Sequence, residues 1–249
     1  MLRYSSFIHH TTLLKSSVLI VGVGAIGLQI ARTIAAMGVG SITLMDHDKV
    51  EAVNLGTQGW REGQLGMAKV EAARNDLEAI NPNCRISTVG GKFTEKNATI
   101  AGMHDVVFCC VDSMKARKLI FNNATPIFID ARMSAFTIYS LMVDRAKPGT
   151  AEDYAKTLYS DKDAHQAPCT ARGTYYTALI AAGMSVNLWF QHLMGHVPLY
   201  QSLLYLDQMV LQGGLAEIQT QEPDEPADST PESSGHAPAS GQSSSSHQD

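Results

Sequence analysis

Apolar and polar residues alternate in blocks along the first half of the chain, in the pattern of strands followed by helices. Residues 18–21 form a short apolar run that predicts a buried strand, and a glycine-rich turn, a helix and a second strand follow it up to residue 48. In residues 66–82 the apolar side chains recur at helical spacing, which predicts an amphipathic helix ended by its proline. Residues 105–111 are continuously apolar, as in a fully buried parallel strand. The alternation predicts an α/β fold, a Rossmann-like three-layer sandwich with a mainly parallel sheet.

The second half of the chain has a less regular pattern. Residues 135–144 alternate between apolar and polar side chains, which predicts a further strand and a sheet that is mixed in its second half. Residues 174–194 predict a strongly apolar helix ended by Gly195, whereas residues 199–218 fit a strand and a helix equally. The other expected elements are strands at 85–89 and 126–130, a long loop at 50–66, and helices at 1–14, 94–101, 113–122 and 151–158.

The turn after the first strand has the chemistry of a phosphate site. Gly22, Gly24 and Gly27 let the backbone approach an anion, and the N–H groups and dipole at the start of the following helix favour negative charge. Asp46 and Asp48 end the second strand, and Asp46, nineteen residues after Gly27, is placed to bind a ribose hydroxyl. By itself this pattern is typical of any Rossmann-like nucleotide site, most often one for a dinucleotide.

The composition is that of a globular protein, except in a C-terminal tail whose composition differs from the rest of the chain. Its 249 residues are 45% hydrophobic and 17% charged, and no run of apolar residues is long enough for a membrane span. From residue 219 onward Pro, Ser, Glu and Gly dominate, so we expect a folded domain over 1–218 and a disordered acidic tail over 219–249. The tail holds six acidic residues and no Lys or Arg, so it accounts for more than the whole formal charge of −5 and leaves a body near +1, unlike the basic surface of a nucleic-acid-binding protein.

The four cysteines, Cys84, Cys109, Cys110 and Cys169, form no CxxC pair, which argues against a structural zinc site and a disulfide framework. The first fifteen residues have neither the apolar run nor the cleavage site of a signal peptide, so a cytoplasmic location is the default expectation. Cys109 and Cys110 fall within the predicted buried strand and are expected to be core residues.

Four motifs in order carry a more specific signal than the glycine turn alone. GVGAIG, MDHDKVEAVNL, GMAKVEAARNDLEAINP and DVVFCCVDSMKAR, spanning roughly residues 18–117, resemble the ThiF/MoeB/ubiquitin-activating superfamily. Members of this superfamily adenylate the C-termini of ubiquitin-like proteins. The resemblance covers nearly half of the chain.

The resemblance implies a role for individual residues. The glycine turn, Asp46 and Asp48 would hold the nucleotide, Asn54 would contact its phosphate region, and Lys69 would touch the phosphates. Asp112, at the carboxyl end of a strand, would position magnesium. In the reaction a carboxylate attacks the α-phosphorus of ATP while both are anionic, so a cation and a metal must neutralise the charge on the leaving pyrophosphate. ATP and Mg²⁺ are therefore the expected cofactors.

Each of these residues also has an ordinary structural interpretation. Lys69 alone fits a solvated helix face, and Asp112 alone fits the start of a helix capped by Ser113. Their occurrence together, in the order of the family motifs, favours the catalytic interpretation.

Cys169 is the candidate nucleophile. The segment APCTARGTYYTALIAAGM resembles the part of ubiquitin-like activating enzymes in which a Cys-Thr pair precedes a long apolar helix. A thiolate accepts an acyl group well, and a helix N-terminus or Arg172 nearby would lower the pKa of Cys169. The alternative is a small apolar residue in a loop, which its polar neighbours disfavour.

The chain departs from the family pattern at two arginines. Thr57 stands where the family usually has an arginine three residues after the loop asparagine, and Ser6 stands at the second arginine of an RYNRQ-like segment in which Arg3 is kept. We expect Arg61 or Arg132 to supply the missing positive charge. The absence of CxxC pairs, together with the CTAR sequence, favours the ubiquitin-like conjugation branch.

The expected function is adenylation of the C-terminus of a ubiquitin-like protein, followed by transfer to a thioester at Cys169. The expected partners are a ubiquitin-like or sulfur-carrier protein, a conjugating-enzyme-like acceptor and a second copy of the chain, with no nucleic acid and no membrane. Three alternatives stay open. These are a sulfur-carrier adenylyltransferase without an obligatory thioester, a nucleotide-binding scaffold without catalysis and, less favoured, a nicotinamide-dependent oxidoreductase.

Overall fold

The computed structural model describes residues 10–124, 126–159, 174–196 and 200–214. Cys169, Arg172, Arg3, Ser6 and the expected acidic tail lie outside these described residues, as does the expected domain boundary at 218. The described part forms one eight-stranded sheet with the strand order β3-β2-β1-β4-β5-β6-β7-β8. The strands are β1 (Ser17–Val21), β2 (Ser41–Asp46), β3 (Arg85–Gly90), β4 (Val106–Cys109), β5 (Ile127–Ser134), β6 (Thr137–Asp144), β7 (Gln201–Tyr205) and β8 (Val210–Gly214).

The sheet is parallel in its first half and antiparallel in its second. Strands β3, β2, β1, β4 and β5 run parallel, with Val18 of β1 paired to both Ile42 of β2 and Val106 of β4. Strands β6, β7 and β8 then add in antiparallel fashion. The carboxyl ends of the five parallel strands therefore share one edge, where ligands bind in open α/β sheets.

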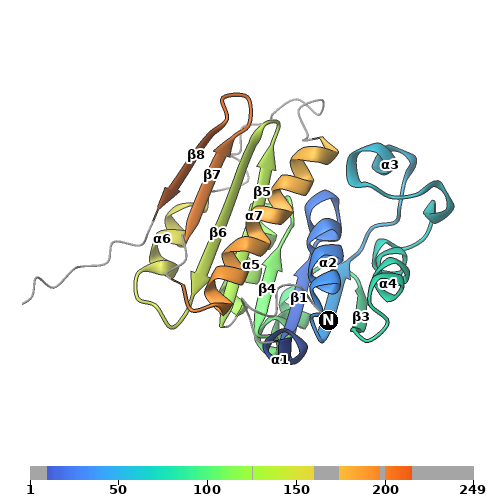
Figure 1. The fold of residues 1–249 in the computed structure, drawn as a ribbon, viewed down its shortest axis with the longest axis horizontal. Coiled ribbons are helices and arrows are strands. Elements are labelled where there is room, and N and C mark those ends of the chain that lie inside the picture. Colours follow the sequence, from blue (N-terminus) through green and yellow to red (C-terminus); the bar gives the residue numbers. More distant parts are fainter. Residues whose placement is uncertain (1–9, 125, 160–173, 197–199, 215–249) are drawn as a thin grey trace, which may run out of the picture. The chain divides into compact units, whose positions relative to one another are not determined.

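Helices cover both faces of the sheet (Figure 1). The side chains of β1 contribute alternately to the hydrophobic cores on the two faces. Val18 and Ile20 join the core formed with α2, α4 and α7, whereas Leu19 and Val21 join the core formed with η2, α5 and α6. Because successive side chains of a strand point to opposite faces, a strand of consecutive apolar residues needs a helix layer on each side. The helices of the two layers are α2 (Ala25–Met37), α4 (Lys69–Ile80), α7 (Tyr175–Leu193), the 3₁₀ helix η2 (Glu95–Met103), α5 (Met114–Asn123) and α6 (Thr150–Lys156).

The predicted fold class is confirmed, with differences in detail. The segment 50–66, expected to be a loop, contains α3 (Ala52–Gln58) and the short 3₁₀ helix η1 (Glu62–Gln64). Helix α3 buries no residue, so the sequence has no apolar periodicity that would reveal it. The undecided stretch 199–218 contains the β7–β8 hairpin, and η2 replaces the α-helix expected over 94–101.

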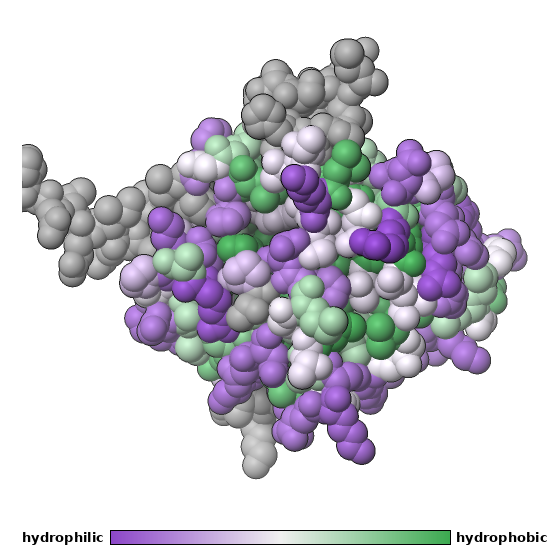
Figure 2. Space-filling view, turned by 90° about the horizontal axis from the view of Figure 1, so that it is seen from below, coloured by the Kyte–Doolittle hydropathy of each residue, from purple (hydrophilic) through white to green (hydrophobic). Residues whose placement is uncertain are grey.

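A short helix, α1 (His10–Lys15), lies at the amino ends of the parallel strands and begins inside the stretch 1–14, which was expected to be helical. Figure 2 views the molecule from this side, where polar residues are interspersed with small apolar patches. Scattered exposed apolar residues of this kind are normal on globular proteins. Among the described residues, no helix has the length and apolar character needed to cross a membrane.

Candidate functional site

The glycine turn joins β1 to α2 and lies against the end of β4. Gly22 has φ +91°, and a Cβ at this residue would lie 2.6 Å from the carbonyl oxygen of Cys110. A Cβ on Gly27 would lie 1.9 Å from the carbonyl oxygen of Gly22, so α2 can approach the turn only without a side chain there. Gly24 is the N-cap of α2, and the first N–H groups of this helix have no partner within the helix. The result is a short, closely packed turn that presents backbone donors at the carboxyl edge of the sheet.

Replacing Gly27 by alanine is expected to lower the free energy of unfolding by about 1–3 kcal/mol, because the added methyl group meets backbone that cannot move away cheaply. Nucleotide affinity should fall as well, since the turn must shift. Chemical denaturation and equilibrium ATP binding measure the two effects. Gly63→Ala is the matched control, because a Cβ at Gly63 meets no atom within 4 Å. Equal stability of the two variants would contradict this account of the turn.

Asp46 ties the glycine turn to the segment that follows β2. Its Oδ2 accepts a hydrogen bond from the Val23 N–H at 2.6 Å, and its Oδ1 accepts one from the Asp48 N–H at 2.8 Å. A carboxylate has about four lone-pair sites, so Asp46 keeps capacity for a further donor such as a ribose hydroxyl.

Lys69 is the first residue of α4, and it lies beside this acidic segment. Its side chain is only 6% exposed, and its Nζ lies 3.1 Å from Oδ2 of Asp48. The Lys69 N–H also donates to the carbonyl oxygen of Asp48 at 2.9 Å. A lysine on a solvated helix face would keep its ammonium group in water. The enclosure of the Lys69 side chain therefore disfavours that interpretation. The structure thus brings Lys69, Asp48 and Asp46 together, as the sequence motifs imply.

The segment 46–48 is also a cluster of potential metal ligands. The ligand atoms of Asp46, His47 and Asp48 lie within 4.8 Å of one another, and Nε2 of His47 is 3.2 Å from Oδ1 of Asp48. However, exposed acidic groups commonly lie close together without an ion, and the Lys69 ammonium group already pairs with Asp48. We therefore assign no metal to this cluster.

Asp112 is exposed and lies between β4 and α5, beyond the carbonyl of Cys110 that contacts the glycine turn. The strand expected over 105–111 ends earlier, at Cys109, so Asp112 stands on the loop rather than directly after the strand. Ser113 caps α5 as predicted, because its Oγ accepts the Ala116 N–H at 3.3 Å. Mg²⁺ in nucleotide sites is typically bound through one or two carboxylates together with substrate phosphates. Asp112 supplies an exposed carboxylate that follows Cys110, the residue against which the glycine turn packs, and such a carboxylate fits that ion.

A buried ionic network is hydrogen-bonded to the loop that carries Asp112. Arg117 of α5 donates to the carbonyl oxygen of Val111 and pairs with Asp130 of β5, whose side chain is completely buried. Asp130 also accepts hydrogen bonds from Arg132 Nε at 2.7 Å and from the Tyr154 hydroxyl at 2.9 Å. Sequence reasoning missed this network, because nothing in the spacing of Arg117 and Asp130 indicates that they pair.

Arg132 and Arg61, the two candidates for the missing charge, are both engaged elsewhere. Both Nη atoms of Arg132 donate to Thr157, at 3.2 Å to its carbonyl oxygen and 2.9 Å to its hydroxyl. Arg61 pairs with Asp76 in the middle of α4, seven residues after Lys69, which is about 10 Å along the helix. The structure does not bring either arginine to Lys69.

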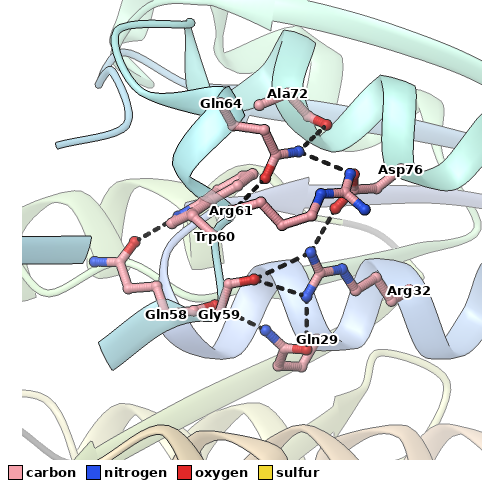
Figure 3. Close-up of polar contacts among 9 residues, drawn as sticks. All are labelled: Gln29, Arg32, Gln58, Gly59, Trp60, Arg61, Gln64, Ala72 and Asp76. Atoms are coloured by element: carbon pink, nitrogen blue, oxygen red, sulfur yellow. Dashed lines mark hydrogen bonds and ion pairs between the residues drawn. The ribbon is translucent and has the colours of Figure 1, made fainter. Parts of the chain in front are cut away.

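The segment α3–η1 is fixed to α2 and α4 by polar contacts (Figure 3). Arg32 of α2 pairs with Asp76 and donates to the carbonyl oxygen of Gly59 at 3.3 Å. Gln64 also donates to Asp76, at 2.9 Å. Asn54 caps α3 by accepting the Glu51 N–H at 3.0 Å. The predicted loop is therefore a structured segment that lies next to the turn.

Cys84, Cys109 and Cys110 are poor nucleophiles. Burial raises the pKa of the Cys84 thiol to about 11, and burial raises the pKa of the other two thiols as well. Cys109 is fully buried, as expected, whereas Cys110 is partly accessible. Since a thiolate is the reactive form, none of these three fits an acyl acceptor at neutral pH. The predicted nucleophile, Cys169, lies outside the described residues.

The chain is similar to known proteins in sequence and in fold. The chain is 43% identical over 116 residues to adenylyltransferase and sulfurtransferase MOCS3 of Drosophila willistoni, covering 46% of this chain and 25% of that one. It is 29% identical over 156 residues to ubiquitin-like modifier-activating enzyme 5 of Caenorhabditis elegans, covering 57% and 37%. The crystal structure of Escherichia coli MccB with ATP superposes with a TM-score of 0.64 at 18% identity, covering 83% and 65%.

The chain spans a quarter to about two-fifths of the length of these two sequence relatives. The family model is broader in its coverage, because it matches residues 8–227, which include every described element. The four ordered motifs, the glycine turn and the parallel sheet with its antiparallel extension thus have one common explanation: the chain belongs to the ThiF family.

Proposed function

We propose that the protein catalyses the ATP-dependent adenylation of the C-terminal carboxylate of a small carrier protein. The observation that carries this proposal is the enclosed Lys69 ammonium group, paired with Asp48, beside the glycine turn and Asp46. A hydride-transfer enzyme has no use for a lysine at that place, whereas adenylation requires a cation close to the phosphates.

In the proposed reaction a carboxylate oxygen of the carrier forms a bond to the α-phosphorus of ATP. The bond between the α-phosphorus and the bridging oxygen breaks, and pyrophosphate leaves. Backbone N–H groups at the start of α2 hold the phosphates, and Asp46 holds the ribose. Lys69 leaves Asp48 and stabilises the charge that develops on the leaving group. Mg²⁺, when bound at Asp112, supplies further neutralisation of that charge.

We propose a ubiquitin-like protein as the carrier and a thioester as the next state of its C-terminus. The thiolate of Cys169 attacks the acyl carbon of the adenylate, a carbon–sulfur bond forms, and AMP leaves. The high pKa of the three described thiols supports this assignment by elimination within the chain. Homodimerisation is proposed on family resemblance alone.

Incubation of the protein with ATP and the carrier is expected to give an adduct that a reducing agent removes. The adduct should vanish in Cys169→Ala and persist in Cys84→Ala, because Cys84 is buried and its pKa is raised. A non-reducing gel detects the adduct. An adduct that survives in Cys169→Ala would exclude Cys169 as the acceptor.

Full pyrophosphate exchange without any adduct would instead favour a sulfur-carrier adenylyltransferase. That second candidate is supported by the similarity to MOCS3, whose name includes a sulfurtransferase activity. ATP binding without pyrophosphate exchange for any carrier would favour a scaffold that has lost catalysis, in keeping with Thr57 at the usual arginine position.

A further inference from the structure

The loop that carries Asp112 is fixed at two successive residues of its main chain. The N–H of Cys110 donates to the carbonyl oxygen of Val21 at 2.8 Å, which continues the pairing of β4 with β1 by one residue. The carbonyl oxygen of the next residue, Val111, accepts a hydrogen bond from Nη2 of Arg117. Asp112 follows Val111 directly and is exposed. The place of its carboxylate therefore depends on how firmly the main chain at Val111 is held.

Arg117 divides its guanidinium group between two partners. It is a buried residue of the first half of α5, and its side chain folds back past the start of that helix to reach Val111. Nη1 pairs with Asp130 and Nη2 donates to Val111, whereas Nε has no partner among the residues that the structure describes. Arginine and carboxylate groups frequently form two parallel hydrogen bonds. Arg117 gives up one of these to hold a main-chain carbonyl, so pairing with Asp130 alone does not explain its orientation.

Asp130 fixes the guanidinium group of Arg117 from β5. Its Oδ1 takes Arg117, and its Oδ2 accepts hydrogen bonds from Nε of Arg132 at 2.7 Å and from the hydroxyl of Tyr154 at 2.9 Å. The side chain of Asp130 is completely buried, and the residue is the register partner of Cys109, the last residue of β4. The main chain before Asp112 is thus tied through Arg117 to the interior of the sheet rather than to solvent.

We propose that Arg117 is a positioning residue of the nucleotide site, which acts through the carbonyl group of Val111 to fix the carboxylate of Asp112 for the Mg²⁺ ion of bound MgATP. The inference rests on the proposed function only in taking MgATP as the ligand. Mg²⁺ requires near-ideal octahedral geometry, so a carboxylate displaced by a small distance binds it less well. A loop fixed in advance also loses less conformational entropy when the ion and the nucleotide bind.

Arg117→Lys tests this role while keeping a positive charge beside Asp130. One ammonium group cannot replace two Nη groups that reach separate partners. Isothermal titration calorimetry with ATP, in excess Mg²⁺ and in EDTA, gives two affinities whose ratio is the magnesium dependence of binding. This ratio is expected to fall about tenfold or more, while the affinity in EDTA stays within about twofold of the wild-type value. Arg117→Gln should give the same result, and it leaves Asp130 paired with Arg132 if the lysine variant folds poorly.

Two further variants separate this role from a structural one. Arg132→Lys makes the same chemical change on the other arginine bound to Asp130 and should leave the magnesium dependence unchanged, because Arg132 donates to Thr157 and not to the Asp112 loop. Asp112→Asn should lower the magnesium dependence, and adding Arg117→Lys should lower it no further, because both substitutions act through one carboxylate.

The proposal would be overturned by additive losses in this double variant, by equal losses in Arg132→Lys and Arg117→Lys, or by an unchanged magnesium dependence in Arg117→Lys or Asp112→Asn. Failure of the wild-type protein to bind MgATP would overturn it as well. If MgATP binds but no carrier supports pyrophosphate exchange, the proposed function fails, whereas the comparison of these variants still decides the role of Arg117.

Discussion

Replacing Lys69 by methionine is expected to reduce the rate of ATP–pyrophosphate exchange by about a hundredfold or more, because a charged donor aimed at the phosphates is lost. The fold should be nearly unaffected. Asp48, the partner of Lys69, is 51% exposed, so the carboxylate left behind stays hydrated. Because no buried charge is left without a partner, loss of this ion pair should cost no more than about 1 kcal/mol.

The matched control is Lys118→Met, which removes an exposed lysine from α5. Its exchange rate should equal that of the wild-type protein, and chemical denaturation should show that both variants are folded. A Lys69→Met variant with an exchange rate within about twofold of the wild-type rate would show that this lysine has only a structural role.

Asp130→Asn is expected to cause the largest loss of stability, about 3–5 kcal/mol in the free energy of unfolding. The substitution keeps the shape of the side chain but leaves Arg117 and Arg132 without their common carboxylate. Arg117 is 4% exposed, and its Nε already lacks a hydrogen-bond partner among the described residues, so little water can reach it. Denaturation with urea measures the loss.

Asp153→Asn is the control for this experiment, because Asp153 pairs with Lys156 on the exposed side of α6 and should contribute less than about 1 kcal/mol. Asp130→Asn should also raise the Mg²⁺ concentration needed for exchange, since Arg117 holds the carbonyl oxygen of Val111 next to Asp112. Similar stabilities of the two variants would show that Asp130 is not essential to the fold.

The strands and the glycine turn could be predicted from sequence because their signals are local. A run such as residues 18–21, apolar at every position, fits a strand covered on both faces, and the cores on the two sides of β1 confirm this. The glycine spacing predicted a turn that can approach an anion; the structure adds a reason of its own for Gly22 and Gly27, whose Cβ atoms would meet the backbone of Cys110 and of Gly22. The ThiF/MoeB resemblance, stated from four motifs, is confirmed by the family model.

Helix α3 and the polar networks could not be predicted because their causes lie far apart in the sequence. Helix α3 buries no residue and is held by Arg32 and Gln29 of α2 at its C-terminal end. Arg61, considered as a phosphate ligand, pairs with Asp76, fifteen residues later in the chain. A charged residue in a sequence shows that a partner is needed, but not which residue lies opposite it in the fold.

The central claim is that the protein transfers an adenylyl group to the C-terminus of a carrier protein. Its most direct test uses ATP labelled at the α-phosphate, with a panel of ubiquitin-like and sulfur-carrier proteins and with the same carriers lacking their last residue. We predict label on at least one intact carrier, release of pyrophosphate, and no label on the shortened form or with Lys69→Met. Binding of ATP without label on any intact carrier would contradict the claim.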